Sequence, residues 1–536
     1  MARGFAFAAF ALVAFASPVR PETCEGLKSL ALAGVTVSSA ESVAAGAFAP
    51  PPNLPPYVAG DPSSYKGLPA FCRVQLQARP SADSDIRIEV WLPAANWNGR
   101  FRAIGNGGFA GSIGYLALAT AVGKGYATAS TDTGHSASFI DAGWAIGHPE
   151  KVADFGYRAI HEMARAAKAT VQAFYGKGPA RSSFASCSNG GRQALMEAQR
   201  FPEDFDGLVA GAPANAWSRL LTSALFDAQV TTNDAQSYIP TSKVPAIARA
   251  VDAACDEKDG VRDGILGDPR ACRFDPQALL CKEGDSPGCL TVPQAKALAS
   301  LYEGARDSKG ARIFPGFLPG AEEGGGGWGT WITGRAPGQS LLFGFANGFF
   351  ANMVYEKPDW SYKAASLDEA FAAALAKTSK VTDAVDPDLG RFEARGGKLI
   401  LYHGWNDPAI SALNTIDYYD SVMRTMGGDR ASAFVRLYML PGVQHCADGP
   451  GAGGFDERAT DPRRDMFLAL QSWVEDKAAP AALIGTKYEE SEGPPGPPKA
   501  SAKVVLTRPL CPYPQVAKYR GTGDTRDAAS FACALP

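Results

Sequence analysis

Two dipeptides place a cysteine beside a residue that can act in acyl transfer, Cys187-Ser188 and His445-Cys446. A serine hydroxyl is a candidate nucleophile, and a histidine imidazole is a candidate general base. If the two cysteines are bridged, their Cα atoms lie roughly 6 Å apart, and each neighbour adds at most about 3.8 Å of chain. A bridge would therefore hold Ser188 within roughly 14 Å of His445 at Cα. This arrangement predicts an enzyme with a serine nucleophile.

Residues 186–190 read Ser-Cys-Ser-Asn-Gly and follow a short strand-like stretch. The pattern is similar to the small-x-Ser-x-Gly turn of hydrolases, in which a sharp strand-to-helix turn exposes the serine hydroxyl. Small flanking residues are needed because the turn brings neighbouring main-chain atoms close together. A serine-rich turn without a catalytic role is the alternative interpretation of these residues.

Asp407 and His445 each come directly after a predicted strand, over 398–402 and 434–440. The order Ser, Asp, His, with each residue on a loop after a strand, is that of α/β-hydrolases. The histidine accepts the serine proton and returns it to the leaving group, while the acid holds the histidine in the required tautomer. We therefore predict Ser188, Asp407 and His445 as a catalytic triad.

The chain has five histidines, so few residues compete for the role of base. His403 is the main alternative, but it precedes Asp407 and has no cysteine neighbour. We expect His135 to be a structural residue or a hydrogen-bonding pocket residue. His148 and His161 flank or occupy a predicted helix, and we expect both to be structural.

Acyl transfer also needs main-chain N–H groups that face the oxyanion of the tetrahedral intermediate. One would come from Asn189, the residue after the nucleophile. The other would come from the glycine loop after an early strand, either Gly107 or Gly108, with Gly107 slightly preferred. A tight turn or a phosphate-binding loop is the alternative, but the Gly-Lys-Ser/Thr ending of a nucleotide-binding loop is missing.

A second candidate site lies in 255–265, which reads Cys-Asp-x-x-Asp-Gly-Val-x-Asp-Gly-Ile. Closely spaced carboxylates and glycines suit calcium, which takes roughly six to eight oxygen ligands. An acidic turn is the alternative. We predict a structural calcium ion, because the stretch lies far in sequence from the triad. The predicted ligands are the side chains of Asp256, Asp259 and Asp263 and the main-chain carbonyls of Val261 and Ile265.

Ten cysteines, an even number, are consistent with an oxidising compartment. A zinc site formed by the cysteines and histidines is disfavoured because no C-x2-C or H-x3-H spacing occurs. Spacing suggests local pairs, although it does not determine the connectivity. The suggested pairs are Cys255 with Cys272, Cys281 with Cys289, Cys511 with Cys533 and Cys24 with Cys72, which leaves Cys187 for Cys446.

Residues 1–16 contain Arg3, an apolar run and the small-x-small sequence Ala14-Phe15-Ala16. This pattern predicts a secretory signal peptide cleaved near Ala16, and the run is too short to span a bilayer. A secreted or periplasmic protein is therefore expected. The net charge is −3 and no basic run occurs, so neither nucleic acid nor a membrane surface is an expected partner.

Short apolar strands alternate with helical stretches, which is typical of an α/β sheet. From about 215 to 395 this alternation is lost, and a chain of 536 residues should divide into at least two domains. We predict an α/β-hydrolase core (17–214 and 396–490) interrupted by a lid domain with the calcium site (215–395), then a linker and disulfide-closed C-terminal tail (491–536). The other predicted strands cover 86–92, 101–104, 126–131, 183–186 and 208–211, and the predicted helices cover 149–175, 192–200 and 463–475.

Taken together, these motifs resemble the tannase and feruloyl esterase family of secreted serine hydrolases, which includes mono(2-hydroxyethyl) terephthalate hydrolase. The Cys-Ser and His-Cys pair carries the resemblance, supported by the stretches 105–111, 130–135, 207–213 and 508–514. The resemblance implies an α/β-hydrolase core with a calcium-binding lid, disulfides paired as above, and hydrolysis of aromatic carboxylic esters. It assigns the triad and the calcium ligands to the residues named above.

The expected substrate is a small-molecule ester of a hydroxylated aromatic acid, with a feruloyl, other hydroxycinnamoyl or galloyl group. Terephthalate esters are the alternative, but their free carboxylate calls for a cation, and the lid stretch 343–360 contains only Lys357, with Arg335 upstream. A calcium-dependent binding protein without activity is a further alternative, and the oligomeric state is unknown. We expect two or three of the lid aromatics to face the substrate, out of Trp328, Trp331, Phe343, Phe345, Phe349, Phe350, Tyr355 and Trp360.

Overall fold

The computed structural model describes residues 21–52, 54–454, 460–489 and 502–536. The predicted signal peptide (1–16) and the Gly/Pro-rich linker (493–498) lie outside these residues. No described helix is long and apolar enough to cross a membrane.

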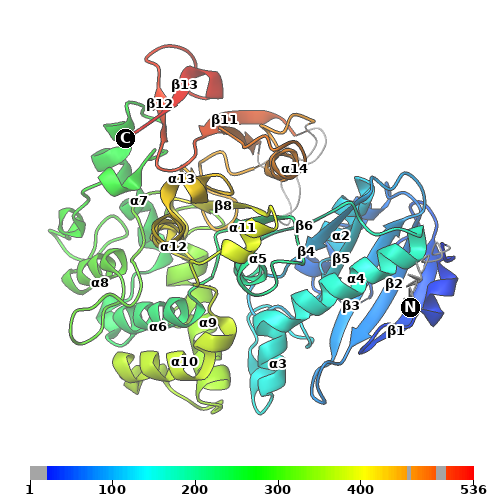
Figure 1. Ribbon diagram of the computed structural model, residues 1–536. Helices are drawn as coiled ribbons and strands as arrows, with labels where there is room; N and C mark the ends of the chain where they lie inside the picture. Colours follow the sequence, from blue (N-terminus) through cyan, green and yellow to red (C-terminus); the bar gives the residue numbers. More distant parts are fainter. Residues whose placement is uncertain (1–20, 53, 455–459, 490–501) are drawn as a thin grey trace, which may run out of the picture.

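A mixed sheet of nine strands organises the described chain, in the order β1-β2-β3-β5-β4-β6-β7-β8-β9 (Figure 1). The first three strands and the β3–β5 pair are antiparallel, and the remaining pairs are parallel. The seven predicted strands are confirmed with ends within two residues, whereas β1 and β2 were not predicted. The strands are β1 (Val35–Val43), β2 (Phe71–Ala78), β3 (Ile86–Pro93), β4 (Arg100–Ile104), β5 (Ala127–Thr131), β6 (Arg181–Cys187), β7 (Gly207–Gly211), β8 (Lys398–Gly404) and β9 (Val435–Leu440).

Helices cover both faces of the sheet, as expected for parallel strands that are buried on both sides. One face packs in a single apolar core with α4 (Ala159–Tyr175), α5 (Asn189–Arg200) and α12 (Ala412–Met426). The other face packs against α2 (Tyr115–Gly123) and α14 (Met466–Asp476). The short helix α1 (Pro56–Ala59) packs against α2, and the short helix α13 (Gly428–Ser432) packs against α12 and β9.

The helix predicted over 149–175 is present, but a π turn interrupts it. Helix α3 (Pro149–Ala153) leads into the π turn Asp154–Arg158 and then into α4. Such a turn breaks the regular main-chain hydrogen-bond ladder, so local carbonyls become available to other donors. Here the carbonyls of Phe155 and Gly156 accept hydrogen bonds from Arg192, at 3.0 and 2.7 Å.

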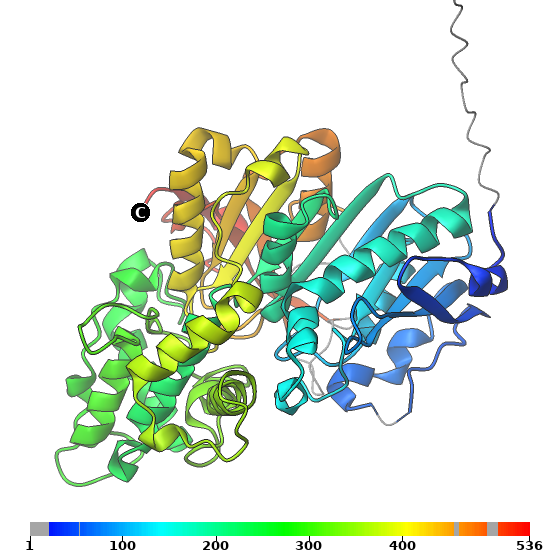
Figure 2. The same cartoon turned by 60° about the horizontal axis from the view of Figure 1, so that its bottom comes forward.

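The stretch between β7 and β8 contributes no strand to the central sheet among the described residues. It forms a helical body beside the sheet, drawn in green and yellow-green in Figure 2, with an apolar core of its own. This body corresponds to the predicted lid. Its helices are α6 (Trp217–Thr232), α7 (Val244–Cys255), α8 (Val292–Glu303), α9 (Leu341–Gly348), α10 (Leu367–Thr382) and α11 (Gly390–Ala394).

The C-terminal tail forms two small antiparallel pairs, β10 (Leu483–Tyr488) with β11 (Val504–Leu510) and β12 (Val516–Tyr519) with β13 (Phe531–Ala534). All ten cysteines are bridged, and each pairing suggested by the spacing is confirmed. The disulfides are Cys24–Cys72, Cys187–Cys446, Cys255–Cys272, Cys281–Cys289 and Cys511–Cys533.

Candidate active site

Ser188 lies at the sharp turn between β6 and α5. Its backbone has φ +64° and ψ −126°, a conformation that L-residues rarely adopt. The turn is compact, because a Cβ on Gly190 would lie 1.9 Å from Ser186 Oγ and one on Gly191 would lie 2.3 Å from the Gly211 carbonyl. The small flanking residues are therefore a steric requirement. The helix begins at Asn189, three residues earlier than predicted.

Ser188, His445 and Asp407 form one hydrogen-bonded chain. The Ser188 hydroxyl lies 2.9 Å from His445 Nε2, and His445 Nδ1 lies 2.7 Å from Asp407 Oδ2. An ionised carboxylate only accepts hydrogen bonds, so Nδ1 carries the proton and Nε2 is free to accept from the serine. This tautomer is the one that general-base catalysis requires.

Asp407 is fully buried, and its carboxylate accepts four hydrogen bonds. Oδ1 accepts from the main-chain N–H groups of Ala409 and Ile410, and Oδ2 accepts from His445 and His403. Burial alone would raise the pKa of Asp407, but the positive potential of His445 and the hydrogen bonds from both histidines hold this pKa well below its usual value. The carboxyl therefore stays ionised.

His403, the alternative base, is directed away from the serine. Its side chain is fully buried, and its Nδ1 pairs with the Thr415 hydroxyl at 2.7 Å. Its Nε2 lies 3.1 Å from Asp407 Oδ2 and 3.0 Å from the Ile410 carbonyl. His403 thus contacts the acid of the triad and has no hydrogen bond to Ser188.

The disulfide Cys187–Cys446 joins the loop of Ser188 to the loop of His445. Its Cα atoms lie 5.9 Å apart, the separation assumed in the sequence argument. The bridge closes 259 residues of sequence and connects the ends of two different structural units, the β6–α5 turn and the loop after β9. A covalent link therefore sits directly beside both reacting side chains.

The glycine loop after β4 reaches the same site. Gly107 and Gly108 line the cavity at Ser188, and Asn189, as the first residue of α5, has a main-chain N–H with no acceptor inside the helix. Gly108 has φ +53°, and a Cβ there would lie 2.2 Å from the Phe139 carbonyl. The loop therefore needs glycine at 108, and it lies at the cavity beside Ser188.

His135 supports this loop from behind, as a structural residue. Its Nε2 pairs with the Phe109 carbonyl at 2.8 Å, and its ring stacks on Trp144 at 3.8 Å. Burial lowers the pKa of His135 to about 4, which keeps the ring neutral. His148 pairs with Asp83, and His161 pairs with Asp204, in agreement with structural roles.

An apolar cavity of about 300 Å³ opens beside Ser188 and His445, between the sheet and the lid. Two of the eight lid aromatics, Trp331 and Phe345, line it, as expected from the sequence. Sequence reasoning missed the rest of the lining. These residues are Phe139, Ala214, Trp217, Leu220, Leu221, Leu342, Ala409 and Ile410.

A model of the family described as tannase and feruloyl esterase matches residues 72–534. This span includes the serine turn, both disulfide-linked loops and the lid. The chain belongs to this family. An uncharacterized esterase of Xanthomonas campestris is 40% identical, over 95% of this chain and 91% of the relative. A probable feruloyl esterase B of Aspergillus clavatus is 33% identical, over 86% of each chain.

The crystal structure of feruloyl esterase B from Aspergillus oryzae superposes with a TM-score of 0.84 at 30% identity, covering 95% of this chain and 99% of that one. Tannin acyl hydrolase from Aspergillus niger shares the fold, with a TM-score of 0.72 at 22% identity over 97% and 94% of the two chains. The predicted fold, an α/β-hydrolase core with a lid and a disulfide-closed tail, is confirmed. As a tannase and feruloyl esterase family member, the protein is a carboxylic ester hydrolase that acts on small-molecule esters of aromatic acids.

Arg192 is a further residue of this esterase site that sequence reasoning missed. It is completely buried and donates to Asn189 Oδ1 at 2.8 Å and to the Thr382 carbonyl at the end of α10 at 3.2 Å. Its guanidinium lies 5.3 Å from the centre of the Trp217 ring. Burial lowers the pKa of Arg192 to about 9. One cation therefore connects the serine helix, the lid and a wall of the cavity.

The acidic loop of the esterase lid gathers the three predicted carboxylates. Burial, and less strongly the neighbouring charges of Asp263 and Asp256, raises the pKa of Asp259. Arg508 of the tail donates to Asp263 at 2.6 Å. Each carboxylate also accepts from main-chain N–H groups of the loop: Asp256 from Gly264, Asp259 from Val261 and Gly267, and Asp263 from Ile265.

Oxygen donors of this type fit a hard cation, although the three carboxylates are spaced more widely than ligands around one ion. Within the described chain, the one set of three potential metal ligands with atoms inside 4.8 Å is Cys281, Asp285 and Cys289. Both of those sulfurs are bridged to each other, so they offer no thiolate.

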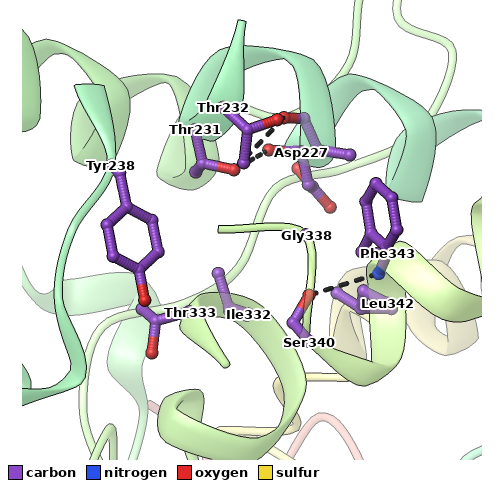
Figure 3. A pocket seen from close by; sticks show the side chains of 11 residues that line it. Asp227, Thr231, Thr232, Tyr238, Ile332, Thr333, Gly338, Ser340, Leu342 and Phe343 are labelled. Atoms are coloured by element: carbon purple, nitrogen blue, oxygen red, sulfur yellow. Dashed lines mark hydrogen bonds between the residues drawn. The ribbon is translucent and has the colours of Figure 1, made fainter. Parts of the chain in front are cut away.

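A separate small cavity of about 10 Å³ lies in the lid beside the buried Asp227 (Figure 3). It has room for about one water molecule and no contact with Ser188. Burial raises the pKa of Asp227 well above its usual value. This cavity is therefore too small and too remote to hold an ester substrate.

Proposed function

We propose that the enzyme hydrolyses hydroxycinnamoyl esters, such as feruloyl esters, through a serine acyl-enzyme intermediate. The apolar cavity beside Ser188 is the observation that carries this proposal. Its walls are aromatic and aliphatic, with Trp217, Trp331 and Phe345 able to contact a flat acyl group. The hydrogen-bonded chain of Ser188, His445 and Asp407 supplies the groups for acyl transfer.

In the first half-reaction, Ser188 Oγ attacks the ester carbon while His445 Nε2 takes the serine proton. The carbonyl oxygen becomes an oxyanion, held by the N–H groups of Asn189 and of Gly107 or Gly108. Collapse of this intermediate breaks the bond from carbon to the alcohol oxygen. His445 gives its proton to that oxygen, and the free alcohol leaves an acyl group on Ser188.

In the second half-reaction, water replaces the alcohol. His445 takes a proton from the water as the water oxygen attacks the acyl carbon. The second tetrahedral intermediate collapses, the bond to Ser188 Oγ breaks, and His445 returns the proton to the serine. The ionised Asp407 carboxylate stabilises the imidazolium in both half-reactions.

The lining of the cavity favours a hydroxycinnamoyl over a galloyl group. Apart from Ser188 and His445, no side chain of the described lining carries a hydroxyl, an amide or a charge. Three adjacent phenolic hydroxyls would lose their hydrogen bonds to water there without finding side-chain partners. A feruloyl group has fewer such hydroxyls to desolvate.

Terephthalate monoesters are disfavoured for a related reason. Their free carboxylate needs a cation or several donors, and the described lining has neither Lys nor Arg. Neither Arg335 nor Lys357, the two lid cations considered from the sequence, is among the lining residues.

We further propose a structural calcium ion on the acidic loop, with side chains of Asp256, Asp259 and Asp263 and carbonyls of Val261 and Ile265 as ligands. The three carboxylates on one loop and the oxygen-only donor set support it. Binding would require the carboxylates to move closer together than they lie in this structure. We also propose that the enzyme is secreted or periplasmic, since fully paired cysteines are typical of oxidising compartments.

A hydrolysis panel tests the proposed function. The substrates are methyl ferulate, methyl p-coumarate, methyl gallate and mono(2-hydroxyethyl) terephthalate, and we expect the first two to be the best. Ser188→Ala should lower kcat at least roughly 1,000-fold, while the control Ser183→Ala, which removes a hydroxyl from the preceding strand β6, should stay active. Full activity of Ser188→Ala would refute the mechanism, and a preference for methyl gallate would refute the acyl assignment.

A further inference from the structure

A second, larger cavity of about 680 Å³ borders the same glycine loop as the catalytic cavity. It runs along β4 and α2, and its lining includes Arg102, Ser112 and Thr120. The two cavities share Gly107 and Phe139. The second cavity therefore adjoins the site where the ester bond would be cleaved.

Gly107 forms an open rim between the two cavities. A Cβ at Gly107 would meet no atom within 4 Å, so the main chain there is not covered by neighbouring side chains. An ester with its acyl group in the apolar cavity of about 300 Å³ must place its alcohol part outside that cavity. The rim at Gly107 gives this alcohol part a route into the second cavity.

Arg102 is the only charged residue in the described lining of the second cavity. Its guanidinium lies 4.2 Å from the centre of the Phe467 ring, and its Nε is buried with no hydrogen-bond partner in the described chain. Arg100, two residues earlier on the same strand, contrasts with it, because its Nε and Nη2 each donate to a carboxylate oxygen of Glu475 at 2.6 Å. Arg102 thus retains donor capacity that the described residues do not use.

We propose that the second cavity binds the alcohol part of the substrate, and that Arg102 recognises a carboxylate on it. Arginine binds carboxylates with paired, charge-assisted hydrogen bonds. Arg102 precedes Gly107 by five residues, a span of at most roughly 17 Å, so the carboxylate lies one or two sugar rings from the ester. The matching ligand is an acylated oligosaccharide with an acidic sugar, whose hydroxyls can bind Ser112 and Thr120.

This inference rests on the proposed function, and kinetics with a matched substrate pair test it. The pair is feruloylated cellobiose and feruloylated cellobiouronate, which differ only in the carboxylate of the distal sugar. The unmodified enzyme should prefer the acidic ester in kcat/KM. In Arg102→Gln the ratio of kcat/KM for the acidic over the neutral ester should fall about tenfold or more, as expected for a lost charge-assisted hydrogen bond.

Arg79→Gln is the matched control, because Arg79 is an exposed arginine that does not line either cavity. The ratio should be unchanged in this variant. Arg102→Lys keeps the charge without the paired geometry and should give an intermediate ratio, and thermal melting checks that each variant is folded. A ratio near one in the unmodified enzyme, or an unchanged ratio in Arg102→Gln, would overturn the proposal.

Binding of the free sugars separates this inference from the proposed function. Cellobiouronate should bind the full chain more tightly than cellobiose by ligand-detected NMR, and Arg102→Gln should remove the difference. If neither feruloyl ester is hydrolysed but this binding pattern holds, the acyl assignment fails and the alcohol subsite stands. Equal binding of the two sugars would overturn the subsite, whatever the enzyme hydrolyses.

Discussion

His403 and His445 donate hydrogen bonds to the same oxygen of Asp407. His445 Nδ1 lies 2.7 Å and His403 Nε2 lies 3.1 Å from Oδ2. The other oxygen accepts two main-chain N–H groups, so the carboxylate cannot rotate without losing several hydrogen bonds. His403 is thus a positioning residue, which acts on His445 through the acid.

Replacing His403 should therefore impair the reaction without a change in substrate binding. In His403→Phe, we expect kcat to fall roughly ten- to hundredfold with KM nearly constant, because a buried hydrogen bond to a charged group is lost. Steady-state kinetics with methyl ferulate as substrate measure the changes in kcat and KM separately. The control His161→Gln removes a histidine–carboxylate pair far from the site. A rise in KM alone, or a pH–rate profile that does not move, would contradict the positioning role.

Removal of the Cys187–Cys446 bridge should reduce activity in protein that is still folded. The two sulfurs sit beside Ser188 and His445, so without the bond the two loops are free to separate. In the double variant Cys187→Ala/Cys446→Ala, we expect kcat/KM to fall by roughly a hundredfold at temperatures below its unfolding transition, because misplacement of reacting groups by about 1 Å has that effect.

The double variant Cys281→Ala/Cys289→Ala is the control for this experiment. It also removes one disulfide, but from a lid loop that does not line the catalytic cavity. Its kcat/KM should equal that of the unmodified enzyme. If both double variants lose activity only in proportion to the fraction of unfolded protein, the Cys187–Cys446 bridge stabilises the fold but does not position the reacting groups.

Much of the catalytic arrangement could be predicted, because residues adjacent in sequence to the catalytic serine and histidine indicate that the two lie close together. Cys187 and Cys446 are adjacent to Ser188 and His445, so one bridge relates residues that the chain separates widely. The parallel strands were also predictable, since each is a short apolar run. Strand β2 was missed, although Val74 and Leu76 alternate with glutamines, which is the pattern of a half-buried strand.

The walls of the cavity could not be predicted, since they depend on tertiary packing. Leu220 and Leu221 read as ordinary apolar residues of a helix, and only the packing of α6 on the sheet places them beside Ser188. Arg192 did offer a signal, as an arginine one turn after the nucleophile. Apart from Asn189, however, its partners are carbonyls of the π turn and of α10, which no local pattern reveals.

The buried Glu322 should make stability depend on pH. Its Oε1 accepts from Tyr302 and Gly320, while its Oε2 has no partner among the described residues. Burial raises the pKa of Glu322 to about 7 from 4.5 in the unfolded chain. Between these values the folded state holds a proton that the unfolded state has lost, so the free energy of unfolding falls as the pH rises through this window.

Glu322→Gln should remove this dependence. The difference in the free energy of unfolding, variant minus unmodified protein, should increase by up to roughly 3 kcal/mol as the pH rises from 5 to 8. Urea unfolding at both pH values measures the difference, and the exposed neighbour Glu323→Gln serves as the control. If the variant is stabilised by the same amount at pH 5 as at pH 8, then packing, and not ionisation of Glu322, causes the stabilisation.

Removal of the proposed calcium ion should affect both stability and catalysis, because the acidic loop packs against the loop of His445. Ile265 forms a small apolar cluster with Ala452 and Leu506, and its Cγ2 would lie 3.1 Å from a Cβ on Gly442. A cation that binds the native state but not the unfolded chain stabilises the fold. We therefore expect a chelator to lower Tm by several degrees and to reduce kcat more than it changes KM.

Two aspartate variants distinguish metal binding from simple charge effects. Asp259→Asn removes a predicted ligand and should abolish the response of Tm to added calcium. Asp285→Asn removes an equal charge from the lid beside the Cys281–Cys289 bridge and should leave that response intact. If the chelator changes neither Tm nor kcat, the loop is an acidic turn held by its own N–H groups and by Arg508, and the calcium proposal fails.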